Sequence, residues 1–215
     1  MKAAVIFYHS NIDKLYEPEW ITQCVESIYA QTYKGFDVFE LNYGKGGKKY
    51  TNGKFFNLKL DTHIDAMNFL ISGIFGLGYD VLLNTNMDDY YCPTRFEKQI
   101  AKIKDGYHLV SSNFQYIGES DKAMRMTAHG DIGENLRKNH NIIAHPVVAM
   151  HRNFWSPDLH YNNLVGYEDL DLWQRAHKRG KKFFILEDCL LYYRIHKSQI
   201  TKSYGINGKK QMRQL

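Results

Sequence analysis

The sequence is poor in proline, cysteine and long apolar runs. It holds 4 prolines and 3 cysteines in 215 residues, and no stretch approaches the ~18 consecutive apolar residues of a membrane-spanning helix. Three cysteines without metal-ligand spacing argue against a disulfide framework. The N-terminal apolar run is too short for a secretory signal, and no small-residue cleavage site follows it. We therefore expect a cytoplasmic protein without a membrane span.

Positive charge is present in modest excess. The chain carries 28 basic and 23 acidic residues, a formal net charge of +5, and no long basic arm. Part of this charge lies in the Gly-rich segments 44–54 and 208–215, where a solvated loop or tail is the simplest interpretation. No motif is typical of a nucleic-acid-binding module, so nucleic acid is not an expected partner. Phosphate-bearing ligands are compatible with this composition.

Apolar runs and helical periods alternate along the chain. Short apolar runs predict strands at residues 3–8, 36–41, 79–84, 107–114, 142–152, 183–186 and 189–196. Apolar residues at helical spacing predict helices at residues 17–33, 61–75, 93–106 and 167–182. Strands that alternate with helices are typical of an α/β sheet covered by helices. The length suits one domain, because domains typically hold ~100–200 residues.

The segment 121–140 has no clean period and is rich in polar residues. Such a segment could close over a ligand as a lid, and it contains Arg125, His129 and Arg137. An ordinary surface loop is an equally good interpretation of the same residues.

Polar residues follow three of the predicted strands at the point where each strand ends. In open α/β sheets, ligands collect beyond the carboxyl ends of the strands. We therefore expect one crevice that gathers the polar residues of these strand ends: Tyr8 and His9, Asn42 and Tyr43, and Asp88 and Asp89.

The adjacent carboxylates Asp88 and Asp89 repel each other, so they need either open water or a cation. Mg²⁺ or Mn²⁺ in phosphate chemistry commonly takes only one or two protein carboxylates, because the phosphates of the substrate complete the coordination shell. A metal site and a solvated turn both fit this pattern.

A second acidic pair, Glu168 and Asp169, follows Gly166 at the start of a predicted helix. These carboxylates could cap the helix, or one of them could serve as a general base. His196 ends the last predicted strand, and it is one of ten histidines, so it carries little weight alone.

Three later segments, in their order along the chain, resemble inverting, nucleotide-sugar-dependent glycosyltransferases with the GT-A fold. They are NMDDYYCPTRFEKQ from residue 86, GYEDLDLWQRAHKRGKKFFIL from residue 166 and LLYYRIHKSQIT from residue 190. Earlier segments at 24–44 and 66–84 resemble the opening helix of that family and the helix that leads to its metal-binding strand. The likeness spans Ala3 to Ser203.

The resemblance implies one GT-A domain over residues 1–205. Such a domain has a mixed, mainly parallel central sheet flanked by helices, with a Rossmann-like nucleotide-binding half. Residues 206–215 would form a polar basic tail, which could begin a linker to further domains.

The resemblance also implies a metal-dependent transfer of a sugar. Asp88 and His196 would hold Mn²⁺ or Mg²⁺ against the diphosphate of the donor, and Asp89 would orient that site or touch the donor sugar. Asp169 would take the proton of the acceptor hydroxyl, with Glu168 as its neighbour or substitute. The acceptor would be a glycan or glycoprotein, and the anomeric centre would be inverted.

Other residues are assigned to the nucleotide by the same resemblance. Asn68 would lie near the nucleotide, and Tyr8 and His9 would lie where the first strand meets its base. Asn42 and Tyr43 replace an aspartate pair of the family, but the Asn42 carbonyl can accept the N3–H of uracil and Tyr43 can stack on the ring. A UDP-sugar is therefore the expected donor.

One departure from the family pattern leaves alternatives open. Asn86 stands where the metal motif has its first aspartate, which removes a carboxylate from the diphosphate side. The main alternative is a catalytically weak sugar-nucleotide-binding or scaffold domain of the same fold. A nucleotidyltransferase is more distant, because no Gly-rich basic signature follows the first strand, and partner binding by the tail has only charge in its favour. The small size resembles compact glycosyltransferases of large DNA viruses, which would place the protein in the host cytoplasm.

Overall fold

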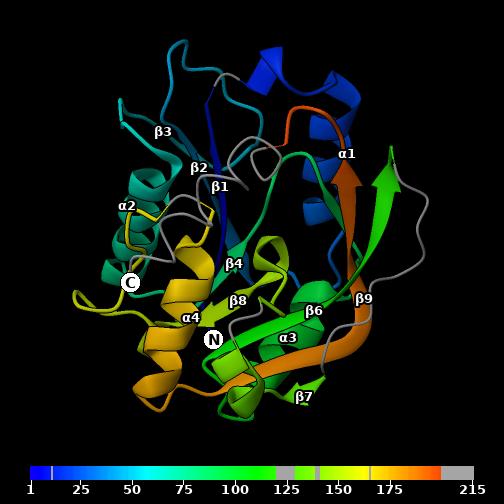
Figure 1. Cartoon of the computed structure of the whole chain (residues 1–215). Coiled ribbons are helices and arrows are strands. Elements are labelled where there is room, and N and C mark those ends of the chain that lie inside the picture. Colours follow the sequence, from blue (N-terminus) through cyan, green and yellow to red (C-terminus); the bar gives the residue numbers. More distant parts are fainter. Residues whose placement is uncertain (11, 120–128, 139–140, 165, 200–215) are drawn as a thin grey trace.

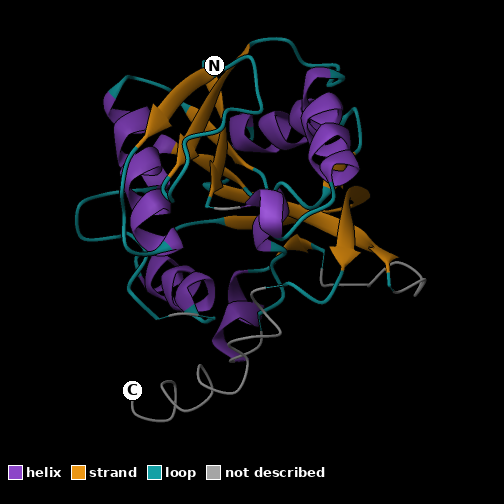
Figure 2. Ribbon diagram, turned by 90° about the horizontal axis from the view of Figure 1, so that it is seen from above, coloured by secondary structure: helices purple, strands orange, loops and turns teal. Residues whose placement is uncertain are grey.

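The computed structural model describes residues 1–10, 12–119, 129–138, 141–164 and 166–199. These residues build one central sheet with helices on both sides, as the two views in Figures 1 and 2 show. The arrangement has three layers, and its core lies in two separate clusters, one on each face of the sheet.

One half of the sheet is wholly parallel. It consists of β1 (Ala3–His9), β2 (Phe36–Asn42), β3 (Lys54–Asn57) and β4 (Val81–Asn84). Strand β1 lies between β2 and β4, and its apolar run is buried because each face contacts one of the two core clusters. The sequence does not predict β3, because this edge strand buries only one of its residues even partly.

The other half of the sheet is mixed. Its strands are β5 (Tyr90–Tyr91), β6 (Leu109–Gly118), β7 (Gly130–Asp131), β8 (Ala149–His151) and β9 (Phe183–Ile195). The short strand β8 is antiparallel to both β4 and β6, while β9 is parallel to β6. The strand order is β3-β2-β1-β4-β8-β6-β9-β5, with β7 also paired to β9. The predicted fold class, a mixed and mainly parallel α/β sheet flanked by helices, is confirmed.

The prediction of two strands at 183–186 and 189–196 is wrong, because β9 is continuous. The acidic residues Glu187 and Asp188 do not break the strand but form a bulge, where the pairing with β6 shifts its register. The side-chain amide of Asn113 donates to the Glu187 carbonyl at 2.9 Å and so satisfies a backbone group that the ladder leaves out.

The predicted strand at 142–152 is only partly a strand. Residues His145–Val147 form the 3₁₀ helix η3, and only Ala149–His151 pairs in the sheet as β8. Proline has a fixed φ and no backbone N–H, so Pro146 favours the first turn of a helix over a ladder position.

Four α-helices cover the sheet within the described residues. Helices α1 (Pro18–Tyr29) and α3 (Arg95–Lys104) pack on one face, and α2 (His63–Gly76) and α4 (Glu168–Lys178) pack on the other. Helix α2 begins with a capping box, in which the Thr62 hydroxyl accepts from the Asp65 N–H and the Asp65 carboxylate accepts from the Thr62 N–H, both at 3.1 Å. Three more 3₁₀ helices are η1 (Ile12–Lys14), η2 (Gly133–Lys138) and η4 (Arg152–Phe154).

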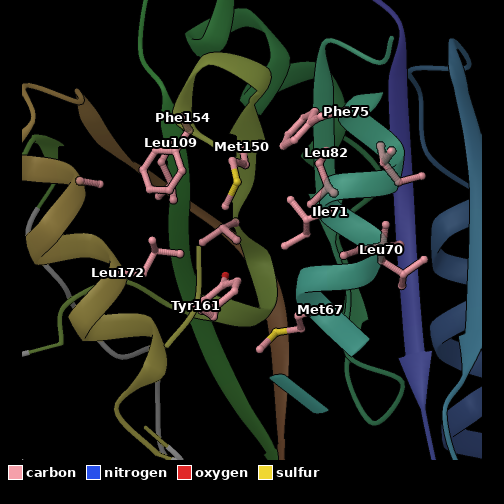
Figure 3. Close-up of a cluster of buried hydrophobic side chains, with 14 of the residues drawn as sticks. Met67, Leu70, Ile71, Phe75, Leu82, Leu109, Met150, Phe154, Tyr161 and Leu172 are labelled. Carbon is pink, nitrogen blue, oxygen red and sulfur yellow. The ribbon is translucent and has the colours of Figure 1, made fainter. Parts of the chain in front are cut away.

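The core on the α2 and α4 face holds both helices against the sheet. Figure 3 shows Leu70 of α2 and Leu172 of α4 on either side of Met150 from β8. Phe154 lies in the same cluster, fully buried, with its ring edge-to-face with Trp173 and Phe183 at 5.8 Å each. This packing fixes where the N-terminus of α4 lies.

Some predictions fall outside the described residues. Residues 121–128 and 139–140 of the lid candidate are among them, and so is the predicted tail at 206–215. In the part of the chain that is described, every helix is too short or too polar to cross a membrane. Cys24, Cys92 and Cys189 are free thiols.

Truncation of Phe154 tests the importance of this core. Phe154→Ala should lower the free energy of unfolding by about 3–5 kcal/mol, because a fully buried ring is lost and a cavity remains. Phe69→Ala, on the exposed side of α2 where the side chain is 46% exposed, is the matched control and should change it by about 0.5 kcal/mol or less. Urea unfolding measures both values, and equal losses would contradict the placement of this core.

Candidate active site

The carboxyl ends of β1, β2 and β4 meet at one edge of the sheet. The three strands run side by side and parallel in Figure 1, and His9 at the end of β1 lies opposite Asn42 at the end of β2. Strand β4 ends at Asn84, and the turn that follows carries Asp88 and Asp89. The predicted meeting of the three strand ends is confirmed.

Asp88 contacts His196, which follows the end of β9. The distance between Asp88 Oδ2 and His196 Nε2 is 3.0 Å, and the two residues are only 8% and 4% exposed. The imidazole contacts two aromatic rings, with centroid distances of 5.4 Å to Tyr16, which precedes α1, and 5.1 Å to Trp20 in its first turn. Its other nitrogen, Nδ1, is buried and has no partner in the described part of the chain. The pair is therefore fixed in a closed environment.

Asp89 is buried more deeply than Asp88, with 1% exposure. Its Oδ1 accepts from the Arg194 N–H at 2.8 Å, while Oδ2 has no partner among the described residues. Burial, together with the charge of Asp88, holds the pKa of Asp89 well above its usual range, although the Arg194 bond opposes this shift. The interpretation of Asp88 and Asp89 as a solvated turn does not fit, because both residues are buried, with 8% and 1% exposure.

Arg194 ties the end of β9 to this turn. Its Nε donates to the Asp88 carbonyl at 2.8 Å, its Nη2 donates to Gln23 Oε1 at 2.6 Å, and its guanidinium lies 4.9 Å from the Trp20 ring centroid. Two residues later the chain reaches His196, so these contacts set the position of the imidazole.

The donor atoms of Asp88 and His196 fit a divalent cation. Two neighbouring ligands of an octahedral cation at ~2.1 Å lie about 3.0 Å apart, as do Asp88 Oδ2 and His196 Nε2. No group of three or more possible ligand side chains occurs among the described residues, so phosphate oxygens and water would have to complete the shell.

Asp169 lies in the first turn of α4. Its Oδ2 accepts from Asn141 Nδ2 at 2.6 Å, and its Oδ1 accepts from the Leu170 N–H at 2.7 Å. Burial and the neighbouring charge of Glu168 raise the pKa of Asp169 to about 6, against the effect of these two bonds. A carboxylate with this pKa is ionised at neutral pH and still basic enough to take a proton.

Glu168 has a different environment. Its Oε1 lies 3.1 Å from His63 Nε2, and its Oε2 accepts from the Gly166 N–H at 2.5 Å. Burial acts to raise the pKa of Glu168, but the His63 bond and the positive potential of His63 and His145 outweigh it and hold the pKa below its usual range. The two adjacent carboxylates thus differ in pKa, and Asp169 is the better proton acceptor.

Tyr8 lies near both acidic groups. Burial and Tyr43 raise its pKa above the ordinary range, and Glu168 and Asp88 add to this shift, while a hydrogen bond with Asn84 opposes it. The charges of both acidic groups therefore act on this side chain. Its hydroxyl stays protonated at neutral pH and can donate a hydrogen bond to a phosphate or sugar oxygen.

A pocket of about 350 Å³ opens beyond the ends of β1 and β2. His9 and Asn42 line it together with the basic side chains Lys14, Lys45 and Lys48. The His9 ring is held by the buried carboxylate of Glu40, which lies 2.9 Å from its Nε2. The pocket therefore has polar walls and a positive rim, which suits a ligand that carries phosphate.

Asn68 makes contacts that hold the fold together. Its Nδ2 donates to the Tyr161 carbonyl at 2.9 Å, and its Oδ1 accepts from the Tyr161 N–H at 3.1 Å. Both ends of the side-chain amide thus bind the backbone of the segment that leads to α4. Its role near the nucleotide stays a prediction.

Three residues at this edge were not expected from the sequence: His63, Asn141 and Arg194. Arg194 had a signal, because it lies two residues before His196 in the same motif. His63 and Asn141 lie 105 and 28 residues from their carboxylate partners, so no local pattern connects them.

Sequence comparison finds glycosyltransferases that are similar to this chain. No protein-family model matches it. The O-antigen biosynthesis glycosyltransferase WbnJ of Escherichia coli is 25% identical over 206 residues, which cover 86% of this chain and 78% of that protein. The amylovoran biosynthesis glycosyltransferase AmsE of Erwinia amylovora is 24% identical over 204 residues, which cover 89% and 76%.

Solved structures of glycosyltransferases share the fold. TarS of S. aureus in complex with UDP-GlcNAc superimposes with a TM-score of 0.74 at 16% identity, and the mannosyltransferase PcManGT of Pyrobaculum calidifontis in complex with GDP-Man and Mn²⁺ with 0.65 at 12%. The fold is that of these enzymes. Each match covers 94% of this chain, which spans 61% of the TarS chain and 59% of the PcManGT chain. Both comparisons support the predicted enzyme class, glycosyltransferase; viral origin and compartment stay predictions.

The raised pKa of Asp169 predicts a pH-dependent stability difference. Ionisation of this carboxyl is disfavoured in the folded state, so the wild type loses stability as pH rises from the unfolded pKa, ~4, through the folded value, about 6. The free energy of unfolding of Asp169→Asn, minus that of the wild type, should rise by about 1–2 kcal/mol from about pH 4.5 to about pH 7.5. This value is discounted for partial exposure. Urea unfolding at both pH values measures this gain.

Asp61→Asn corrects for the general loss of one negative charge, because Asp61 is exposed. A difference between Asp169→Asn and wild type that is the same at both pH values would contradict the environment described for Asp169.

Proposed function

We propose that the protein is a metal-dependent, inverting glycosyltransferase. It transfers a sugar from a nucleoside diphosphate donor, preferably a UDP-sugar, to a hydroxyl of a glycan or glycoprotein. The observation that carries the proposal is the buried Asp88–His196 pair at the carboxyl edge of the sheet, the same edge at which the pocket at the ends of β1 and β2 opens. The relatives and structural neighbours that are glycosyltransferases support it.

The donor would lie across the carboxyl edge of the sheet. Its base and ribose would enter the pocket between His9 and Asn42, and its diphosphate would extend toward Asp88. The positive rim of lysines favours such a ligand. TarS with UDP-GlcNAc and PcManGT with GDP-Man, both of the same fold, support a nucleoside diphosphate donor.

The metal would be held by Asp88 and His196. When bound there, Mn²⁺ or Mg²⁺ supplies Lewis-acid stabilisation of the charge on the departing diphosphate. Asp89 and Arg194 position the two ligands through the backbone contacts at the end of β9. Asn86 offers no carboxylate, so the protein contributes one carboxylate and one imidazole.

The acceptor hydroxyl would give its proton to Asp169. Asn141 holds the carboxylate in place, and Glu168 stays anionic in its contact with His63 and raises the basicity of its neighbour. Attack on the anomeric carbon from the side opposite the diphosphate then inverts its configuration. The two acidic sites would therefore have separate roles. Asp88 would act on the diphosphate side, where negative charge develops, and Asp169 would take the proton of the acceptor.

A scaffold domain that binds nucleotide without turnover is the second candidate. The absence of a carboxylate at Asn86 favours it. The two functions differ in one observable, because a scaffold binds UDP but neither transfers sugar nor hydrolyses the donor.

Replacement of the base tests the mechanism. Asp169→Asn should lower kcat by about 10²–10⁴-fold with the UDP dissociation constant changed by less than about twofold, because a general base acts only in the chemical step. In the wild type, kcat/KM should fall below about pH 6, where Asp169 becomes protonated. Sugar transfer by Asp169→Asn at the wild-type rate would refute this assignment. A larger loss of kcat in Glu168→Gln than in Asp169→Asn would show that Glu168 is the base.

Calorimetric titration of UDP with and without Mn²⁺ tests the metal site. Asp88→Ala should weaken UDP binding in Mn²⁺ by at least about tenfold and leave the metal-free binding unchanged, because the variant removes a ligand of the metal rather than of the base. Asp105→Ala, an exposed carboxylate at the end of α3, is the matched control. Binding of UDP that ignores Mn²⁺ in the wild type would refute the metal-dependent proposal.

A further inference from the structure

The side-chain amide of Asn42 is held in one orientation. Its Nδ2 donates to the Gly44 carbonyl at 3.2 Å and to Asn57 Oδ1 at 2.8 Å. A backbone carbonyl can only accept, so the group that faces Gly44 must be the NH₂ and cannot be the oxygen. Both amide hydrogens of Asn42 are thus used inside the protein.

The carbonyl oxygen of Asn42 is the polar atom that remains for a ligand. No partner for this Oδ1 is found in the described part of the chain, and the oxygen is not sealed from the surface. Asn42 is only 2% exposed, yet it lines the pocket at the ends of β1 and β2. The pocket therefore presents a fixed acceptor at this point.

Asn57 lies beside Asn42 at the edge of the sheet. It ends β3 and lies opposite Asn42 in the parallel register of β2 and β3. Its Oδ1 accepts from Asn42 Nδ2 at 2.8 Å, which leaves its own Nδ2 on the side of Gly47, where a Cβ atom would lie 2.7 Å from that nitrogen. Gly47 also has a φ of +70°, which favours glycine. The loop after β2 therefore approaches Asn57 closely, and Asn57 adds a second acceptor for the Asn42 amide beside the Gly44 carbonyl.

We propose that Asn57 is a specificity-determining positioning residue, which orients the amide of Asn42 so that the pocket selects a nucleobase with a ring N–H. The inference rests on the proposed function, because it assumes that this pocket takes the base of the donor. Asn57 does not touch the base and acts only through Asn42.

The chemistry of the bases defines the selectivity. Uracil carries a hydrogen on N3, and guanine carries one on N1, so both can donate to a fixed carbonyl oxygen. Cytosine has a bare N3 and adenine a bare N1, and each would place a lone pair against that oxygen. A buried acceptor without a donor costs more than a hydrogen bond contributes, so the mismatch discriminates strongly. An Asn42 amide that could turn over would lose this discrimination, because its NH₂ would suit cytosine.

UDP and CDP are the probes that test the inference, because they share ribose, diphosphate and ring size. Calorimetric titration of each into the wild type in Mn²⁺ should show tighter binding of UDP. Asn57→Ala should weaken UDP binding about fivefold to tenfold, the loss expected for one partly buried hydrogen bond. CDP binding should stay equal or improve. The CDP dissociation constant divided by the UDP dissociation constant should therefore fall by at least the same factor.

Two further variants separate orientation from general damage. Asn57→Asp keeps an oxygen that accepts from Asn42 Nδ2, so it should retain the wild-type ratio of the UDP and CDP constants. Lys59→Ala is the matched control, because Lys59 is exposed and lies two residues beyond Asn57. It should change neither constant. A thermal melt of each variant checks that it is folded.

The outcomes are distinguishable. If the wild type prefers UDP and Asn57→Ala keeps that preference, or loses both nucleotides equally while folded, the inference is overturned and the proposed function stands. If Asn57→Asp loses the preference as Asn57→Ala does, orientation through Asn57 is likewise overturned. If the wild type binds neither UDP nor GDP, the proposed function falls and takes the inference with it.

Discussion

The contact between Asp88 and His196 depends on the whole sheet. These residues are 108 positions apart, and they meet only because β8 lies between β4 and β6 and β9 then pairs with β6. This order brings the end of β9 beside the turn that follows β4. Each strand in the series must be in place before the two ligand atoms reach 3.0 Å. The mixed half of the sheet therefore positions the Asp88–His196 pair.

Burial of charge is the second constraint at this edge. Asp89 is almost fully buried, and Arg95 is fully buried beneath the same turn, where its Nη2 donates to the Asn84 carbonyl at 2.6 Å and its Nε to Gln99 Oε1 at 3.0 Å. Burial lowers the pKa of Arg95 to about 10, so the guanidinium is still charged at neutral pH and offsets the carboxylates. The hydrogen bonds of Arg95 therefore connect the end of β4 to α3 beneath the acidic turn.

The two ends of the crevice use different physics. At the β1–β2 end, the pocket is lined by Asn42 and by lysines, and the Asn42 amide donates to Asn57 Oδ1. At the α4 end, two adjacent carboxylates receive opposite pKa shifts from His63 and from burial. The charges of Glu168 and Asp88 both raise the pKa of Tyr8.

The sequence by itself determined the order of strands and helices, the polar residues at the strand ends and the motif order that resembles glycosyltransferases. These features are local, because periodicity and strand-end polarity act over a few residues. It could not predict the continuity of β9 or the 3₁₀ turn at Pro146, where pairing with β6 and the missing N–H outweigh an apolar pattern.

Only the tertiary structure decided which side chains meet. It buried Asp88 and Asp89 instead of leaving them in water, paired His63 with Glu168, and set the Asn42 amide in one orientation. The physical reason is that burial, and with it pKa and hydrogen-bond partners, comes from strand order and helix packing between residues far apart in the chain.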